Sequence, residues 1–245
     1  MIQGFSDAKL AVVKRGPEEV REQALLCEHI GSDVCPQIYR YLPDGYEMEL
    51  LNPSPHRTSS TLLSVQAILE TKVWDREPYR NWTREWLEPL HSWASDSGAF
   101  HIAEVIPLVY PEEPEDGYRL IHGDPTLANL MIRSNGEWVL TDPMPRLTYR
   151  QEIPNRVEVD LGKLLQSAVG WERMLGYESS CWDQPDLVLR TLSRDMRMKT
   201  MLWGAIHLYR VSRRALVKGT LRIANWAVHE STILCKMLKV EHRAC

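Results

Sequence analysis

A short run near the middle of the chain, Leu120 to Leu130, restricts the possible folds more than any other stretch. It reads LIHGDPTLANL and sets Asp124 and Asn129 in an otherwise apolar, strand-like context. The triplet Ser134-Asn135-Gly136 then predicts a tight turn, because Asn-Gly tolerates positive φ. Apolar residues on both sides of this turn predict a β-hairpin, and Asp142 follows its second strand. We therefore expect the hairpin to bring Asp142 beside Asn129.

These three polar side chains suit chemistry on a nucleotide. The Asp124 carboxylate can accept a proton or orient a hydroxyl, and the oxygens of Asn129 and Asp142 are the hard ligands that Mg²⁺ prefers. A base and two oxygen ligands around a metal are the main requirements of phosphoryl transfer. Each residue alone has an ordinary explanation, since Asp before Pro forms turns and Asn-Gly occurs in many hairpins. The ordered combination is rarer and favours the catalytic interpretation.

The motif His122-Gly123-Asp124, followed by four residues, Asn129, a strand pair and Asp142, resembles the aminoglycoside phosphotransferase and choline kinase family. The resemblance implies an α+β, two-lobe protein-kinase-like fold with a reduced N-terminal β lobe and a mainly helical C-terminal lobe. It implies Asp124 as catalytic base and Asn129 and Asp142 as ligands of Mg²⁺. ATP would be the phosphoryl donor, and a small-molecule hydroxyl, on a sugar, an amino alcohol or a similar compound, the acceptor.

Two further segments refine this resemblance. Pro125-Thr126-Leu127-Ala128 departs from the antibiotic-modifying members, which usually carry a second His there. This stretch and the run Val159 to Ser167 are more similar to members associated with sugar and surface-polysaccharide metabolism. The resemblance also implies that Asp160 braces the catalytic loop by hydrogen bonds. We expect His122 to hold the loop in the same way rather than to take part in chemistry.

The N-terminal segment supplies candidate nucleotide-binding residues. Lys14 ends a buried-strand pattern and matches the strand lysine that holds nucleotide phosphates in kinase-like folds; an edge-strand lysine is the alternative. In the family a glutamate of the following helix, here residues 17–30, pairs with that lysine. Glu22 is the best match and Glu19 the second choice, and a solvent-facing glutamate is the alternative. Gly4-Phe5-Ser6 is interpreted as a remnant of the phosphate-covering loop.

A second pair of strands is predicted on either side of the turn Asp44-Gly45. The second strand resembles the one that leads into the family's interlobe hinge, so backbone groups around Glu49, Leu50 and Leu51 would bind adenine. The breaker cluster Asn52-Pro53-Ser54-Pro55 marks the expected lobe boundary. We therefore expect a nucleotide-binding small lobe over residues 1–51 and a helical lobe with the catalytic loop and acceptor site over 52–245.

The rest of the chain is predicted to be mainly helical. Helices are expected over 58–74, 78–94, 99–110, 160–171, 187–198, 201–214 and 220–240, and a strand over 118–121. Arg210, Arg213, Arg214, Lys218 and Arg222 form a basic segment in an otherwise acidic chain. A solvated helix face is the ordinary interpretation of such a segment, and a site for a phosphorylated or acidic acceptor is the other.

Composition narrows the class of protein. The chain has 245 residues, 44% of them hydrophobic, and a net charge of −4, which argues against a nucleic-acid partner. It has no apolar run long enough to span a bilayer and no apolar signal segment at its start. Its five cysteines are odd in number and show no metal-type spacing, so we expect reduced thiols in a cytoplasmic enzyme. A regulatory pseudokinase and a kinase of protein substrates are the alternative functions.

Overall fold

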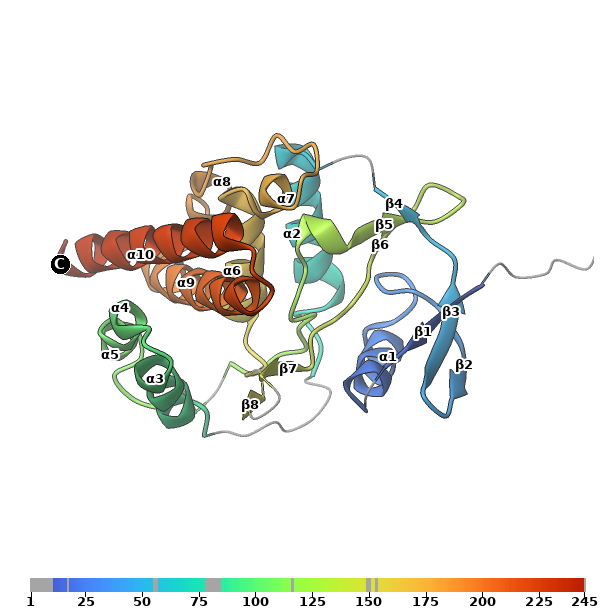
Figure 1. Cartoon of the computed structure of the whole chain (residues 1–245), viewed down its shortest axis with the longest axis horizontal. Helices are drawn as coiled ribbons and strands as arrows, with labels where there is room; N and C mark the ends of the chain where they lie inside the picture. Colours follow the sequence, from blue (N-terminus) through green and yellow to red (C-terminus); the bar gives the residue numbers. More distant parts are fainter. Residues whose placement is uncertain are drawn as a thin grey trace, which may run out of the picture.

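A computed structural model of the chain describes residues 11–16, 18–54, 57–77, 85–115, 117–148, 151–152 and 154–244. A small β-rich part with one helix lies at one end of the molecule, and the long helices lie at the other (Figure 1). The predicted phosphate-covering remnant Gly4-Phe5-Ser6 and the side chain of Glu19 lie outside the described residues.

The β-rich part consists of three antiparallel strands and helix α1 (Glu18–Ile30). The strands β1 (Ala11–Arg15), β3 (Gly45–Glu49) and β2 (Ile38–Leu42) lie side by side in that order. Helix α1 ends where Gly31 adopts a φ of +103°, which side chains other than glycine rarely adopt. The predicted helix stop and the two predicted strands are thus confirmed within a few residues.

The predicted hairpin forms the second sheet. Strand β5 (Leu130–Ile132) pairs antiparallel with β6 (Trp138–Leu140), and β4 (Asn52–Pro53) pairs with the other edge of β5. Gly136 has a φ of +87°, as the Asn-Gly turn requires. Because β4 directly follows the first sheet in the chain, this second sheet joins the β-rich part to the helical part.

Helices make up most of the chain after residue 58, and a third, two-stranded sheet lies near the bottom of the view in Figure 1. The two strands of this sheet are β7 (Arg146–Thr148) and β8 (Gln151–Glu152). The helices are α2 (Ser59–Lys72), α3 (Leu87–Asp96), α4 (Phe100–Ala103), α5 (Ile106–Val109), the 3₁₀ helix η1 (Leu127–Asn129), α6 (Val157–Ala168), α7 (Trp171–Met174), α8 (Asp186–Leu189), α9 (Arg194–Val217) and α10 (Leu221–Arg243). Among the described helices, none combines the length and the apolarity that crossing a bilayer requires.

Three sequence predictions of elements were wrong. The strand expected over 118–121 is reduced to one isolated bridge between Tyr118 and Arg156. The helix expected over 187–198 is two helices, because the Ser193 side chain caps a new helix by accepting from the Met196 N–H at 3.3 Å. The helix expected over 99–110 is likewise split into α4 and α5.

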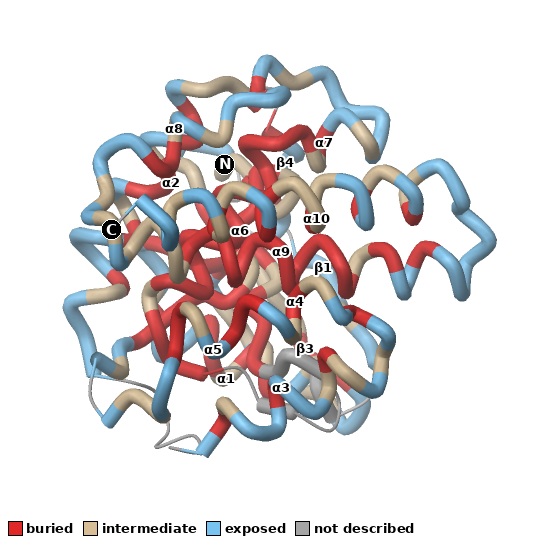
Figure 2. Tube along the Cα trace, turned by 90° about the vertical axis from the view of Figure 1, so that its left-hand side faces the viewer, coloured by how far each residue is buried: buried red, intermediate tan, exposed pale blue. Residues whose placement is uncertain are grey.

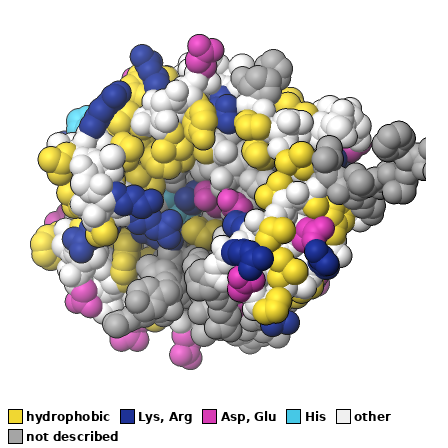
Figure 3. Space-filling model, turned by 45° about the vertical axis from the view of Figure 1, so that its right-hand side comes forward, with side chains coloured by type: hydrophobic (Ala, Val, Ile, Leu, Met, Phe, Trp, Pro, Cys, Tyr) yellow, Lys and Arg dark blue, Asp and Glu magenta, His cyan; other side chains and the backbone are white. Residues whose placement is uncertain are grey.

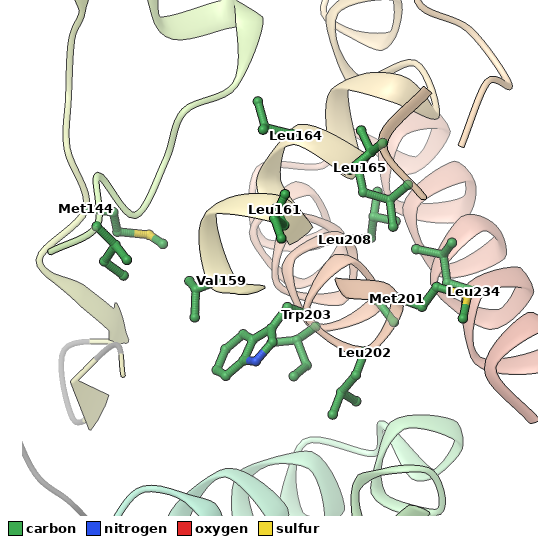
Figure 4. Close-up of a cluster of buried hydrophobic side chains, with 14 of the residues drawn as sticks. Met144, Val159, Leu161, Leu164, Leu165, Met201, Leu202, Trp203, Leu208 and Leu234 are labelled. Atoms are coloured by element: carbon green, nitrogen blue, oxygen red, sulfur yellow. The ribbon is translucent and has the colours of Figure 1, made fainter. Parts of the chain in front are cut away.

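The hydrophobic core is centred on α6, α9 and the helices around them. Figure 2 shows buried residues concentrated along these two helices, and Figure 4 shows Trp203 of α9 among the leucines that surround it. At the crossing of α6 and α9, a Cβ on Gly162 would lie 2.7 Å from the Trp203 Cβ. Glycine is therefore needed there for the two helices to approach so closely. This close contact fixes the position of α6 relative to α9.

Candidate active site

The predicted catalytic loop, residues 122–129, is a tight turn that orients Asn129. Its backbone N–H donates to the Thr126 carbonyl at 3.0 Å, and its side-chain Nδ2 donates to the Asp124 carbonyl at 2.9 Å. The amide nitrogen is therefore occupied, while Oδ1 has no hydrogen-bond partner among the described residues. An amide held by its nitrogen presents its oxygen, which is the atom that a hard cation binds.

The hairpin brings Asp142 beside this loop, as predicted. The N–H and the hydroxyl of Thr141 both donate to the Asn129 carbonyl, at 2.9 and 3.1 Å. Asp142 itself adopts a φ of +57°, an uncommon backbone conformation for a residue other than glycine. Strained conformations of this kind concentrate at functional sites, where the surrounding structure enforces them.

Lys14 reaches this site from strand β1. Its Nζ forms an ion pair with the Asp142 carboxylate and donates to the Gln23 amide oxygen at 2.9 Å. Glu22, the predicted partner of Lys14, is buried in α1 and is 8% exposed. Gln23 was not considered from the sequence, although its place beside Glu22 on the same helix is a signal that could have identified it. The role of Glu22 stays a prediction.

The predicted hinge residues lie at the end of the first sheet. The Glu49 N–H donates to the Gln37 carbonyl at 3.0 Å, and its carboxylate accepts from Arg133 Nε at 3.0 Å, so both groups are already engaged. The Leu51 side chain is buried. Glu49 and Arg133 also line a cavity of about 630 Å³ beside the hairpin turn, which Asp124, Asn129 and Asp142 do not line. The adenine-binding role of Glu49 and Leu51 stays a prediction.

The start of the catalytic loop is held by Asp160 of α6, and this prediction is confirmed. Its carboxylate accepts from the N–H groups of His122 at 2.9 Å and Gly123 at 2.6 Å, and from the Trp74 indole at 2.9 Å. Burial raises the pKa of Asp160 to about 6, although all three hydrogen bonds act to lower it. Asp160 therefore holds the start of the loop in place.

His122 also holds the loop, as predicted. It is fully buried, and its Nδ1 accepts from the Asp124 N–H at 3.3 Å. Burial lowers the pKa of His122 to about 4, while Asp124 and Asp142 act in the opposite direction. The neutral imidazole is thus the form that accepts this hydrogen bond near neutral pH.

The second half of the loop is held from the helical side. The Ser167 hydroxyl accepts from the Leu127 N–H at 3.1 Å and donates to Glu172, which also accepts from the Ala128 N–H at 3.0 Å. Glu172 is fully buried, and burial raises its pKa. Leu127 and Ala128 are thereby held by groups of α6 and α7.

Lys163 is a further residue of the candidate site that sequence reasoning missed. Its Nζ lies 3.1 Å from Asp124 Oδ1, and its side chain is 8% exposed. Asp160, Lys163 and Ser167 fall at i, i+3 and i+7 in this buried helix, so they share one face. A polar stripe in a helix that is buried on all sides is the signal that could have found Lys163.

The pH dependence of stability should reveal the buried histidine. The pKa of His122 is about 4 in the folded state and near 6.5 in the unfolded state. The neutral ring therefore contributes fully to stability above pH 6.5, and this contribution is lost as the pH falls through 4. We expect this loss to reach about 3 kcal/mol, by the linkage between pKa and stability. The pKa of His207 is also lowered, so His207 adds to this loss of stability at acidic pH. The raised pKa of Asp160 has the opposite effect on stability as the pH falls.

Denaturant unfolding between pH 7 and pH 4.5 would measure this effect. The His122→Asn variant should be less stable at pH 7 and show a shallower loss of stability on acidification. His91→Asn, at an exposed position, serves as the matched control and should keep the wild-type slope. Equal slopes for wild type and His122→Asn would contradict the interpretation.

The residues at this site fit a magnesium ion. Asn129 Oδ1 and the Asp142 carboxylate come from adjacent segments, and both are hard oxygen donors. No group of three or more His, Cys, Asp or Glu side chains suited to a metal occurs in the part of the chain that the structure describes. One amide and one carboxylate nevertheless agree with Mg²⁺ chemistry, because this ion takes its other ligands from substrate phosphates and water.

The sequence matches no family model and no curated protein. Solved structures do match. An ethanolamine kinase of Plasmodium vivax superposes with a TM-score of 0.58 at 12% identity, over 94% of this chain and 77% of that chain. A candidate aminoglycoside phosphotransferase from Ralstonia eutropha superposes with a TM-score of 0.50 at 12% identity, over 96% of this chain and 88% of that chain. With its small sheets and mainly helical C-terminal part, the chain therefore adopts the protein-kinase-like fold that the sequence predicted.

Proposed function

We propose that this chain transfers the γ-phosphoryl group of ATP to a hydroxyl of a small molecule. The observation that carries the proposal is the convergence of Lys14, Asp142 and the Asp124–Asn129 loop. Lys14 forms an ion pair with the Asp142 carboxylate. Asp142 directly follows Thr141, whose N–H and hydroxyl both donate to the Asn129 carbonyl. A cation, two oxygen ligands and a carboxylate base are the groups that phosphoryl transfer requires.

In the proposed reaction Asp124 receives the proton of the acceptor hydroxyl. The acceptor oxygen forms a bond to the γ-phosphorus, and the bond from this phosphorus to the β–γ bridging oxygen breaks, with its electron pair going to the leaving ADP. Lys14 would hold the phosphates, positioned by Glu22 or Gln23. Adenine would bind at the backbone near Glu49 and Leu51, between a small lobe of residues 1–51 and a large lobe of residues 52–245.

Asn129 and Asp142 would hold the Mg²⁺ that accompanies the nucleotide. When bound, the ion supplies positive charge that neutralises the phosphate oxygens as the phosphoryl group moves. In the structure Lys14 already pairs with Asp142. Binding of the metal-nucleotide complex would therefore require Lys14 to exchange this carboxylate for phosphate oxygens.

The experiment that tests the proposed function is a screen for phosphorylated small molecules. Purified chain is incubated with γ-labelled ATP, Mg²⁺ and a deproteinised cell extract, and Asp124→Asn is run in parallel. Labelled solutes that appear with wild type and not with the variant support the proposal. Label that ends on protein, when whole extract is used, favours the protein-kinase alternative. Binding of ATP without any transfer favours the regulatory pseudokinase.

Removal of the strand lysine should weaken nucleotide binding. We expect Lys14→Met to lower ATP affinity about 10-fold or more, because a charge-assisted contact to phosphate contributes about 1.5–3 kcal/mol. Isothermal titration calorimetry with and without Mg²⁺ would measure the loss. Arg15→Met is a matched control, since Arg15 lies next on the same strand and pairs with Asp44 at the surface. Equal losses in both variants would exclude a specific phosphate contact at Lys14.

A further inference from the structure

The connection between α9 and α10 extends away from the rest of the molecule (Figure 2). Only three residues, 218–220, separate the two helices. Gly219 adopts a φ of +72°, and the Thr220 N–H donates to the Ala215 carbonyl at 2.8 Å, which closes the turn tightly. We define the α9–α10 tip as residues 213–222.

Three aliphatic side chains of the α9–α10 tip face solvent. Leu216 is 48% exposed, Val217 90% and Leu221 62%. Exposed aliphatic side chains that are scattered singly over a surface are ordinary, but these three lie on either side of one short turn. The tip is therefore an apolar projection that nothing in the described part of the chain covers.

Cations flank these aliphatic side chains. Four of the five residues of the predicted basic segment are exposed on the tip, namely Arg213, Arg214, Lys218 and Arg222. None of the four forms an ion pair or a side-chain hydrogen bond within the described ranges. The fifth residue, Arg210, is buried and lies outside the tip. Because residues 196–229 contain no Asp or Glu, the positive charge of the tip is not neutralised by its own segment.

The charge of the tip is opposite to that of the molecule as a whole. The chain carries a net charge of −4. In the surface view, Lys and Arg side chains gather on one side of the central hollow and acidic side chains on its other side (Figure 3). Charges act on one another over only about 10 Å at moderate ionic strength. An anionic surface would therefore attract the tip and repel the acidic parts of the molecule, which fixes the orientation of approach.

We propose that the α9–α10 tip docks the chain onto an anionic lipid bilayer. Aliphatic side chains next to Lys and Arg are the combination that interfacial segments use. The aliphatic groups enter the boundary between head groups and acyl chains, and the cations contact the anionic head groups. A projecting tip suits such a surface, because a bilayer offers apolar depth without a preformed pocket. This inference does not depend on the proposed function.

Two other occupants fit the tip less well. A nucleic acid would contact the cations, but it offers phosphate and sugar where Leu216, Val217 and Leu221 require an apolar partner. A second copy of the tip could cover these side chains, but it would bring two sets of four cations together. The experiment below distinguishes both of these, and an acidic protein, from the bilayer.

The test measures partition of the full chain onto vesicles by cosedimentation. One set of vesicles is pure phosphatidylcholine, and the other contains roughly one third anionic phosphatidylglycerol. Wild type is compared with a charge variant, Lys218→Gln with Arg222→Gln, and with an aliphatic variant, Val217→Ser with Leu221→Ser. All four positions are exposed, so we expect both variants to fold, and thermal unfolding checks this.

Wild type should bind the anionic vesicles and bind the neutral ones at least tenfold more weakly. The charge variant should bind anionic vesicles about 25-fold more weakly than wild type, because each Lys or Arg near such a surface contributes about fivefold. The aliphatic variant should lose at least about tenfold, because its apolar groups no longer enter the bilayer.

Matched controls lie toward the other end of α10. Lys236→Gln with Arg243→Gln removes the same net charge as the charge variant, and Val240→Ser removes an aliphatic side chain that is also exposed. We expect both controls to bind anionic vesicles within twofold of wild type. Losses in these controls equal to those in the tip variants would overturn the proposal.

Other outcomes also overturn the inference. These are a lack of wild-type binding to anionic vesicles and undiminished binding by the aliphatic variant. Soluble polyglutamate and duplex DNA are titrated in parallel. If either binds wild type as tightly as the vesicles do and is lost in the charge variant, an acidic protein or a nucleic acid is the partner instead. Self-association of wild type that disappears in the aliphatic variant, measured by sedimentation equilibrium, would assign the tip to a second copy.

Discussion

Replacing Asp124 with asparagine should lower the rate of phosphoryl transfer about 10²–10⁴-fold, the usual contribution of a positioned base, with ATP affinity within about threefold of wild type. Asparagine keeps the size of the side chain but cannot take the hydroxyl proton. The nucleotide contacts assigned to Lys14 and Asp142 would remain. The measurement is kcat with the acceptor found by the screen, combined with calorimetric titration of ATP.

Two comparisons make this prediction specific. Asp195→Asn, at an exposed position where Asp195 pairs with Lys199, should leave kcat unchanged. Asp142→Asn should weaken binding of the metal-nucleotide complex as well as turnover, because Asp142 is the proposed ligand of the ion. A turnover number for Asp124→Asn within threefold of wild type would rule out Asp124 as the base.

The second large effect is expected on stability, at Asp160. Replacing it with alanine should lower the free energy of unfolding by about 3–5 kcal/mol, because three donors lose their acceptor and each buried, unsatisfied donor costs about 1–3 kcal/mol. Those donors are the Trp74 indole and the N–H groups of His122 and Gly123. Removing a buried carboxylate offsets part of the loss. Urea unfolding at pH 7 would measure the difference.

Asp160→Asn provides a graded comparison. Its amide oxygen can accept from one or two of the three donors, so we expect a loss between those of wild type and alanine. Asp195→Ala, which removes an exposed carboxylate, should change stability by no more than about 0.5 kcal/mol. If Asp160→Ala were as stable as Asp195→Ala, the hydrogen bonds to the loop would contribute nothing to the fold.

Several parts of the fold could be predicted because their signals are local. The turn at Gly136, the end of α1 at Gly31 and the N-cap Thr58 of α2 each follow from residues within one turn of the chain. The juxtaposition of Asn129 and Asp142 is of the same kind, because a hairpin joins them. The role of Asp160 was predicted from a resemblance and was confirmed by its contacts with the loop.

Other predictions failed because the deciding partner is distant. Residues 118–121 have an apolar strand pattern, but the Leu120 N–H donates to the Arg76 carbonyl, and within the described part of the chain no strand lies beside them to form a ladder. The prediction of one helix over 187–198 overlooked the capping Ser193 in the middle of this range. The contact of Lys14 with Gln23 depends on how α1 is rotated against the first sheet, which helical periodicity does not specify.

The sequence by itself determined that Asp124, Asn129 and Asp142 come together, because the loop, the turn and the second strand are contiguous and follow short-range backbone preferences. Only the tertiary structure decided which cation borders Asp124. Lys163 belongs to α6, which follows the loop at a distance in the chain, and the packed position of α6 brings its Nζ to 3.1 Å from Asp124 Oδ1. Side-chain contacts of this kind depend on interhelical distance and rotation, which are set by core packing and not by local sequence.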